Sequence, residues 1–247
     1  MNYLILAGGT GTRIKSVAKN LPKPLVEIFG VPSLIRIINQ IKLFDKKSKI
    51  FISCFYESDQ IIKAVKDINN VICLKEPSKL GTGGAVKYFL NKSNVNDFCL
   101  LNGDTLINFD FDCLKFKWNQ KKDKYGIKSM VFLKKMPGDC SDFGTYKVNS
   151  GKVINFKEKS KTSNALVSTG VYFFNSVDLK KEFLRFKKKF SFEEDFLPHY
   201  IKKNKLAFEV LSEFDNFFDI GTLERLNEAK NNFFNLLKRP AAFFDRD

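Results

Sequence analysis

An apolar run passes directly into a glycine-rich turn at residues 3–13, which read Tyr3-Leu4-Ile5-Leu6-Ala7-Gly8-Gly9-Thr10-Gly11-Thr12-Arg13. Residues 3–6 predict a short β-strand. The glycines after it let the backbone turn tightly and bring its N–H groups close to phosphate oxygens. Arg13 adds a guanidinium, which binds phosphate through charge-assisted hydrogen bonds. The stretch therefore predicts a phosphate-binding turn at the end of a strand.

Two common phosphate loops are excluded by the residues that follow. The GxGxxG dinucleotide pattern, started at Gly9, requires a glycine at position 14, which is Ile14. The P-loop requires Gly-Lys followed by Ser or Thr, and the chain contains no such triplet. On this stretch alone, a glycine turn without any ligand stays open as the alternative.

The first half of the chain alternates apolar strands with amphipathic helices. Strands are expected at residues 3–6, 49–54, 71–74 and 98–102, and helices at 34–44 (capped by Ser33), 58–66 and 83–90. Such alternation predicts a mostly parallel sheet covered on both faces. Ligands of such sheets bind at the carboxyl ends of the strands. Gly8-Gly9 and Asn102-Gly103-Asp104 both fall at strand ends, so we expect them to meet at one site.

The second half is richer in strands, expected at residues 129–133, 145–148, 153–157, 171–174 and 206–211. Ser191 and Glu194 form a capping box that opens a helix toward Tyr200. Thr222 caps a final helix, whose Leu223, Leu226, Ala229 and Phe233 share one face. We expect one α/β domain over residues 1–237, with a Rossmann-like, mostly parallel or mixed sheet sandwiched by helices.

The chain has 247 residues and a formal net charge of +15, which raises the question of nucleic-acid binding. Its lysines are spread along the whole chain, and no recognition helix, zinc spacing or RNA-binding aromatic motif accompanies them. We therefore expect no nucleic-acid partner and interpret the charge as a solvated surface that attracts anionic substrates.

Membrane and disulfide classes are also disfavoured. No apolar run approaches the roughly 20 residues of a membrane helix, and the N-terminus lacks the basic region of a signal peptide. The five cysteines form no CxxC pair, which predicts free, partly core thiols. The single histidine, His199, has no partner motif and is expected to be structural. These features predict a cytoplasmic protein without a membrane partner, and they leave its oligomeric state open, a homo-oligomer included.

A second motif, Pro22-Lys23-Pro24, follows the glycine turn. The two prolines hold the backbone extended around Lys23 and limit its freedom. A lysine fixed in this way presents its ammonium group to a phosphate, although an ordinary basic loop is the alternative for this segment taken alone.

Together the two motifs resemble the sugar-1-phosphate nucleotidyltransferase family, whose signature is GGxGTR followed by PKP or PKA. Further family motifs follow in the family's order: Glu76-Pro77, Leu80-Gly81-Thr82-Gly83-Gly84-Ala85, Asn102-Gly103-Asp104, Phe156-Lys157-Glu158-Lys159, Ser168-Thr169-Gly170-Val171-Tyr172 and Phe218-Asp219-Ile220-Gly221-Thr222. The resemblance covers most of the chain.

The resemblance implies a displacement without a protein nucleophile. The sugar 1-phosphate oxygen attacks the α-phosphorus of a nucleoside triphosphate and pyrophosphate leaves, so the enzyme positions two anions and neutralises their charge. It implies that Asp104 and Asp219 hold Mg²⁺, which carboxylates suit chemically. It also implies that Arg13 stabilises the leaving pyrophosphate and Lys23 the transferred or incoming phosphate.

The same resemblance implies two sets of binding residues. For the nucleotide these are Leu6, Ala7, Gly8, Gly9, Gly11, Thr12, Glu76, Gly81, Thr82, Gly83 and Gly103. For the sugar phosphate they are Asn102, Gly144, Glu158, Lys159, Thr169 and Gly170. Lys159 is expected on the phosphate and Glu158 on the hydroxyls. Without the family, Asp219 is interpreted as a helix cap and Glu158-Lys159 as an exposed strand end.

Residues 76–85 and 189–196 look most like the D-glycero-D-manno-heptose 1-phosphate guanylyltransferase branch, which implies GTP as donor and GDP-heptose, a precursor of surface glycans, as product. Mannose-1-phosphate guanylyltransferases and uridylyl or cytidylyl transferases are the alternatives. A catalytically silent nucleotide-sensing module is a further alternative, and its mark would be the loss of Asp104, Lys159 or Asp219, all of which are present.

The last ten residues, 238–247, resemble the opening strand of a haloacid-dehalogenase-type phosphatase. In that family the first aspartate of the DxD pair, here Asp245, is the nucleophile and the second, here Asp247, is the general acid and base. The form resembles heptose bisphosphate and histidinol-phosphate phosphatases. We therefore expect residues 1–237 to be the transferase part of a bifunctional protein, with residues 238–247 as a linker and the beginning of a phosphatase.

Overall fold

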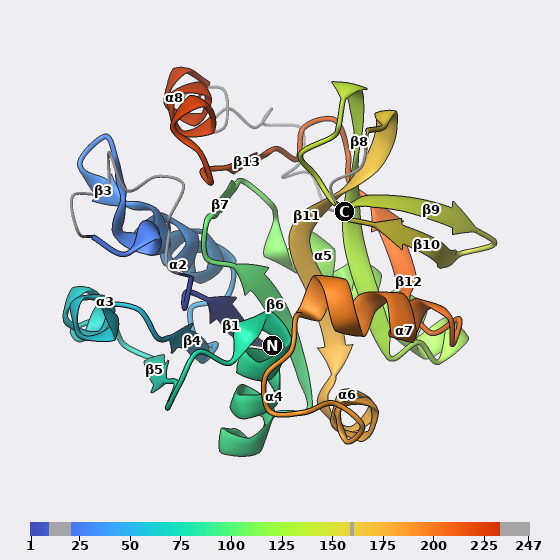
Figure 1. Cartoon of the computed structure of the whole chain (residues 1–247), viewed down its shortest axis with the longest axis horizontal. Helices are drawn as coiled ribbons and strands as arrows, with labels where there is room; N and C mark the ends of the chain where they lie inside the picture. The colour runs from blue at the N-terminus through green and yellow to red at the C-terminus, as the bar shows by residue number, and fades with distance from the viewer. Residues whose placement is uncertain (10–20, 159–160, 233–247) are drawn as a thin grey trace, which may run out of the picture.

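The computed structural model describes residues 1–9, 21–158 and 161–232. Their main feature is a sheet with the strand order β5-β4-β1-β6-β11-β8-β12-β10-β9 (Figure 1). The strands span Val71–Lys75 (β5), Ile50–Cys54 (β4), Asn2–Leu6 (β1), Asp97–Asn102 (β6), Ser163–Asn175 (β11), Ser129–Asp139 (β8), Ala207–Val210 (β12), Lys152–Lys157 (β10) and Thr145–Asn149 (β9).

The direction of the strands changes along the sheet. From β5 to β6 all pairs are parallel, as the strand–helix alternation of the first half predicts. β11 then pairs antiparallel with both β6 and β8, β12 is parallel to β8, and β10 is antiparallel to β12 and β9. The prediction of an α/β fold with a mixed sheet is confirmed.

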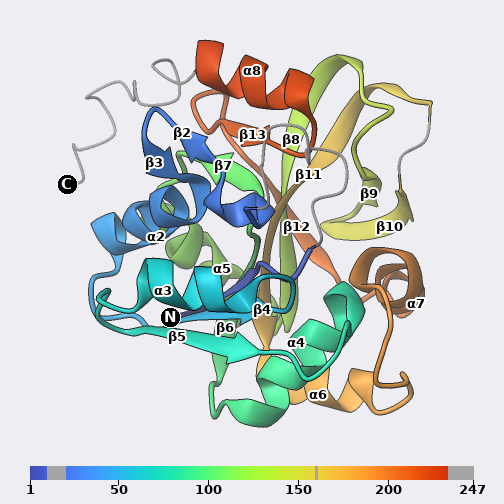
Figure 2. The same ribbon diagram turned by 60° about the vertical axis from the view of Figure 1, so that its left-hand side comes forward.

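Helices cover both faces of the sheet, because successive strand residues point to opposite sides. Tyr3 and Ile5 face a core with α2 (Ser33–Phe44), α3 (Ser58–Val65) and α5 (Phe111–Tyr125). Leu4 faces a second core with α4 (Gly81–Lys92), α6 (Ser176–Phe183) and α7 (Leu197–Ile201). Figure 2 shows the two helical layers on either side of the strands.

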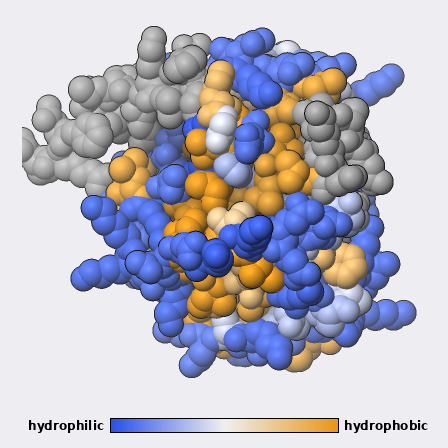
Figure 3. All heavy atoms as spheres, turned by 90° about the vertical axis from the view of Figure 1, so that its left-hand side faces the viewer, coloured by the Kyte–Doolittle hydropathy of each residue, from blue (hydrophilic) through white to orange (hydrophobic). Residues whose placement is uncertain are grey.

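Short elements complete the described chain. They are the 3₁₀ turn η2 (Lys23–Leu25), the hairpin β2 (Glu27–Ile28) and β3 (Val31–Pro32), the pair β7 (Thr105–Ile107) and β13 (Phe217–Asp219), the π-helix η3 (Phe192–Phe196) and helix α8 (Leu223–Asn231). On the face of Figure 3, apolar side chains gather near the centre and hydrophilic ones surround them.

Three helix starts differ from the sequence prediction. Ser33 does not cap α2 but is its first residue, and its hydroxyl donates to Pro24 O at 2.9 Å. Helix α4 begins at Gly81, two residues earlier than expected. The Ser191 hydroxyl accepts from Glu194 N as expected, but Ser191 N donates to Asp195 Oδ2 and not to Glu194. The π-helix η3 intervenes before α7.

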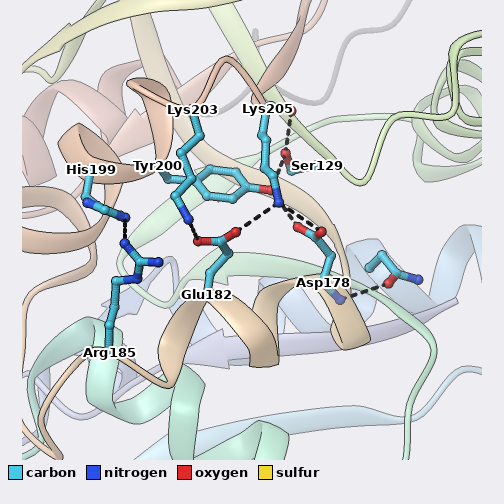
Figure 4. A network of polar contacts seen from close by, with 9 residues as sticks. Ser129, Asp178, Glu182, Arg185, His199, Tyr200, Lys203 and Lys205 are labelled. Carbon is cyan, nitrogen blue, oxygen red and sulfur yellow. Dashed lines mark hydrogen bonds and ion pairs between the residues drawn. The ribbon is translucent and has the colours of Figure 1, made fainter.

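The expected cap of the last helix and the expected free cysteines are confirmed. The Thr222 hydroxyl accepts from Arg225 N and caps α8. The cysteines are free. His199 lies at the surface, where it contacts Arg185 at 2.9 Å (Figure 4). No helix within the described ranges is both long and apolar enough to cross a bilayer. The division expected at residue 237 and the phosphatase-like tail lie outside the described residues and stay predictions.

Candidate active site

A cleft of about 440 Å³ opens where β1 and β6 end, as expected for a sheet of this kind. Most of the predicted site residues that the structure describes line it: Leu6, Ala7, Gly8, Gly9, Lys23, Glu76, Gly81, Thr82, Asn102, Gly103, Asp104, Gly144, Glu158, Thr169, Gly170 and Asp219. Gly83 does not. Gly11, Thr12, Arg13 and Lys159 lie outside the described residues.

Two aspartates form one wall of the cleft. Asp104 follows β6, and β7 just after it pairs antiparallel with β13, so that Asp219 lies opposite Thr105. Ile220 N donates to Asp104 O at 3.0 Å and joins the two segments. The Nζ of Lys23, delivered by the rigid Pro22–Pro24 segment, donates to Asp104 Oδ2. Two carboxylates and one ammonium group from distant parts of the chain therefore lie on the same wall of the cleft.

Asp219 has a cationic partner of its own. Arg225, on the first turns of α8, donates from Nη1 to Asp219 Oδ2 at 2.6 Å. Its Nη2 lies 2.7 Å from Asp142 Oδ2, and its guanidinium lies 4.8 Å from the centre of the Phe143 ring. Asp142 and Phe143 line the cleft. Arg225 was not predicted as a site residue, because the only signal in the sequence is its place three residues after a helix cap.

The glycines at the ends of β1 and β6 permit a close approach of the backbone. A Cβ atom at Gly103 would lie 2.5 Å from Leu6 O, and one at Gly8 would lie 2.9 Å from Glu76 Oε1. Gly103 N donates to Leu6 O at 2.9 Å and fixes this junction. A side chain at Gly103 would therefore separate the ends of β1 and β6, and one at Gly8 would displace the Glu76 carboxylate.

Glu76 is a buried carboxylate at the end of β5. It is 7% exposed, lines the cleft and accepts from Ser53 Oγ at 2.8 Å. Burial raises the pKa of Glu76, and the hydrogen bonds from Ser53 and the backbone of Leu80 oppose this shift. The carboxylate is thus held in place and directed to the region where the predicted nucleotide residues gather.

The glycine-rich start of α4 packs against the segment that contains Lys188 and Phe190. Gly83 N and Gly84 N both donate to Phe190 O, at 3.1 and 3.2 Å. A Cβ at Gly83 would lie 2.2 Å from the Phe190 ring, and one at Gly84 would lie 2.5 Å from Lys188 O. The structure therefore places Gly83 in a packing contact, not in the cleft where it was predicted.

The remaining wall of the cleft comes from β9, β10 and β11. Gly144 lies against Glu158, because a Cβ there would be 3.1 Å from Glu158 Oε2. Gly170 has a φ of +73°, which glycine adopts without strain, and it packs on the Asn102 side chain. Thr169 is 1% exposed and its hydroxyl donates to Phe132 O at 2.8 Å, so that side chain positions the strand.

This wall also carries hydroxyl groups that were not predicted. Tyr172 OH lies 2.8 Å from Tyr146 OH and 3.0 Å from Ser168 Oγ, and both Tyr172 and Ser168 line the cleft. Ser168 and Tyr172 stand at the two ends of the Ser168–Tyr172 motif, which was the signal that could have identified them. The cleft thus joins a wall of charged groups to a wall of hydroxyls and carboxylates.

A model of the nucleotidyl transferase family matches residues 2–235. The chain belongs to this family. It is 36% identical over 228 residues to the D-glycero-alpha-D-manno-heptose 1-phosphate guanylyltransferase of Campylobacter jejuni, an alignment that covers 91% of this chain and 96% of that protein. It is 30% identical over 233 residues to the enzyme of the same name from Aneurinibacillus thermoaerophilus, with 93% and 97% covered.

A solved structure agrees with this assignment. HddC from Yersinia pseudotuberculosis, complexed with GMP-PN, superposes with a TM-score of 0.77 at 29% identity, over 94% of this chain and 99% of that one. The chain is a sugar-1-phosphate nucleotidyltransferase, an enzyme whose substrates are a nucleoside triphosphate and a sugar 1-phosphate. The cleft described above therefore has to accommodate two anionic substrates.

Proposed function

We propose that this nucleotidyltransferase transfers GMP from GTP to D-glycero-D-manno-heptose 1-phosphate, which yields GDP-heptose and pyrophosphate. The proposal is supported by the two guanylyltransferases of that name, which match almost the whole chain. The guanine nucleotide GMP-PN in the complex of the Yersinia protein also supports it.

The observation that carries the choice of guanine is the buried carboxylate of Glu76. Guanine presents two adjacent donors, N1–H and the N2 amino group, and a carboxylate accepts both in a bidentate manner. Uracil presents one N–H between two carbonyl oxygens, and a carboxylate would face one of these oxygens. Cytosine and adenine present one amino group beside a ring-nitrogen acceptor. Among the four bases, guanine alone matches a carboxylate with two neighbouring donors.

The charged wall suits the transfer step. Lys23 contacts Asp104 on the wall that also carries Asp219, so its ammonium group can neutralise a phosphate that enters there. The substrates bring several negative charges together, and a fixed cation near the reacting phosphorus lowers the cost of their approach. Arg13 and Lys159 are proposed to act on the pyrophosphate and the sugar phosphate, respectively.

The donor set fits Mg²⁺. Two carboxylates on adjoining strands supply hard oxygen ligands, and magnesium sites at phosphates commonly use one or two carboxylates together with substrate oxygens. The described residues contain no group of three or more acidic, His or Cys side chains that would suit a cage made by protein alone. We propose that Asp104 and Asp219 hold the ion, which would polarise the phosphate oxygens when bound.

The test is a matrix of the four nucleoside triphosphates against a set of sugar 1-phosphates that includes manno-heptose 1-phosphate and mannose 1-phosphate. Pyrophosphate release is the readout, with and without Mg²⁺. We expect the highest kcat/KM for GTP with the heptose, and none above background after chelation. A preference for UTP or CTP would overturn the choice of guanine, and a preference for mannose 1-phosphate would replace the heptose. Tight GTP binding without turnover on any sugar would indicate a sensing module.

A further inference from the structure

The segment at residues 189–196 contributes the π-helix η3 to the cleft. Its Phe192 and Phe196 are fully buried, and the Phe192 ring packs edge-on against Tyr172 at 5.3 Å. Phe196 packs against Phe183 and Tyr200, at 4.8 and 4.9 Å. These rings fix η3 from the core side. Single π-helical turns are rare and frequently lie at functional sites.

Glu193 lies between these two anchors, and it lines the cleft. Thr82 Oγ1 donates to Glu193 Oε2 at 2.6 Å, and Ser191 Oγ approaches the same oxygen at 3.4 Å. The Thr82 hydroxyl in turn accepts from Phe192 N at 2.8 Å, so its direction is fixed. The carboxylate is held by neutral hydroxyls from two elements, α4 and the start of η3.

Keeping a charged carboxylate among neutral hydroxyls costs free energy of folding, so a function is needed to explain why an acid stands at this position. Burial raises the pKa of Glu193; the Thr82 hydrogen bond opposes this shift, and the nearby charge of Glu158 adds to it. A glutamine could accept the same Thr82 bond without the cost of a charge, so packing alone does not account for the acid. Glu193 and Glu158 instead share a cleft wall with Ser168 and Tyr172, a set of acceptors and hydroxyls none of which is a cation.

We propose that Glu193 is a second sugar-recognising carboxylate, which accepts hydrogen bonds from hydroxyl groups of the sugar 1-phosphate beside those that Glu158 is expected to accept. The inference rests on the proposed function, and it adds to it the residue that selects among polyhydroxylated substrates. Sugar hydroxyls are neutral donors, and hydrogen bonds from them to a carboxylate are stronger than bonds to a neutral acceptor. Thr82, predicted as a nucleotide residue, acts in this account as a positioning residue for Glu193.

The test compares Glu193→Gln with the wild type on whichever sugar 1-phosphate the substrate matrix identifies. Loss of a hydrogen bond to a charged group predicts an increase of about 10- to 100-fold in the KM of the sugar 1-phosphate. The KM of the nucleotide and the melting temperature should stay close to wild type. Glu213→Gln, at an exposed site outside the cleft, is the matched control and should change none of these values. Calorimetric titration with the sugar 1-phosphate gives the same comparison without turnover.

A second measurement separates recognition from packing. Monodeoxy sugar 1-phosphates are assayed on both enzymes, and the analogue that lacks the contacted hydroxyl should lose kcat/KM on the wild type but little on Glu193→Gln. Equal penalties on both enzymes for every analogue would overturn the proposal, as would a parallel rise in both KM values or a wild-type KM in the variant. If the wild type prefers a sugar other than heptose, the heptose assignment fails while Glu193 is still tested on that sugar.

Discussion

The guanidinium of Arg225 joins Asp219 to Asp142 across the rim of the cleft, with 2.6 and 2.7 Å between its two terminal nitrogens and the carboxylate oxygens. Asp219 is one of the two proposed magnesium ligands. Asp142 lies in the same loop as Gly144, which packs against Glu158. One side chain of α8 therefore fixes both the charged wall and the loop between β8 and β9.

Replacing Arg225 should reduce turnover without unfolding the enzyme. Lysine carries one compact ammonium group, which cannot reach two carboxylates in the planar fork that arginine provides. We expect Arg225→Lys to lower kcat by about 10-fold and Arg225→Met by more, since Asp219 loses the group that orients it. Steady-state kinetics and a thermal melt provide the measurement. Asp142→Asn removes only the outer contact, so a loss as large as that of Arg225→Met would contradict the role assigned to the Asp219 contact.

Asp104→Asn tests the proposed magnesium site itself. The substitution keeps the shape of the side chain and its contact with Lys23 but removes a charged ligand, so turnover should fall by at least about 100-fold. Circular dichroism should show an unchanged fold. Binding of Mn²⁺, followed by its paramagnetic effect on water relaxation, should weaken in parallel. Full activity in this variant would rule out Asp104 as a ligand.

The contact between Lys23 and Asp104 shows what could and could not be predicted from the sequence. Both residues were predicted from motifs, but nothing local shows that side chains 81 positions apart touch. Asp219 was open to a second interpretation as a helix cap. The structure assigns the cap to Thr222 and places Asp219 in β13, opposite β7. Pairing between two short strands so far apart in the chain depends on tertiary packing, which no local pattern encodes.

Helix α5 was missed for a different reason. Its apolar residues Phe111, Leu114 and Trp118 follow helical spacing, and Asp110 caps it by accepting from Asp112 N and Cys113 N. The lysine-rich second half of the helix, after Trp118, obscures that pattern. By contrast the strands at residues 3–6 and 98–102 were predicted almost to their ends, because buried parallel strands are continuous apolar runs.

Gly83 was assigned to the nucleotide, but the structure gives it a packing role that can be tested. An added methyl group would overlap the Phe190 ring at 2.2 Å, so Gly83→Ala should destabilise the protein by about 1–3 kcal/mol. Denaturant unfolding provides the value. Adding Phe190→Leu should recover part of the loss, because a smaller side chain makes room for the methyl group. No recovery in the double variant, together with a specific rise in the KM of GTP, would return Gly83 to the nucleotide site.

The network around Glu182 predicts a pH dependence of stability. Glu182 accepts from Lys203, and from Lys205 at 2.9 Å, and Lys205 also reaches Asp178 (Figure 4). Burial alone would raise the pKa of Glu182, but the two lysines outweigh it and lower the pKa below its ordinary value. A lowered folded-state pKa contributes stability that is present above the unfolded-state pKa, near 4.5, and is lost as the pH falls through the folded-state pKa.

Glu182→Gln should therefore cost about 1–3 kcal/mol at pH 7 and progressively less below pH 4.5. Urea titrations of both proteins at a series of pH values measure the difference. Glu213→Gln, at an exposed position, should follow the wild type at every pH. A constant difference between Glu182→Gln and the wild type across this range would show that the ion pairs do not stabilise the fold.

The proposed recognition of guanine by Glu76 also predicts a pH dependence. Here the pKa of the carboxyl group is raised, whereas that of Glu182 is lowered. Burial raises the pKa of this carboxyl group, so it begins to bind a proton at a pH above its ordinary value of 4.5. The protonated acid carries a hydrogen where guanine presents N1–H, and one of the two proposed hydrogen bonds is lost. The KM of GTP should therefore rise as the pH falls toward the raised pKa, while the KM of the sugar 1-phosphate stays nearly constant after correction for its own phosphate ionisation.

Glu76→Gln cannot titrate, and its amide offers a donor where an acceptor is needed. We expect this variant to show a KM for GTP that is higher by about 10- to 100-fold and that no longer depends on pH in this range. If the variant keeps both the wild-type KM and its pH dependence, the base is recognised elsewhere in the cleft.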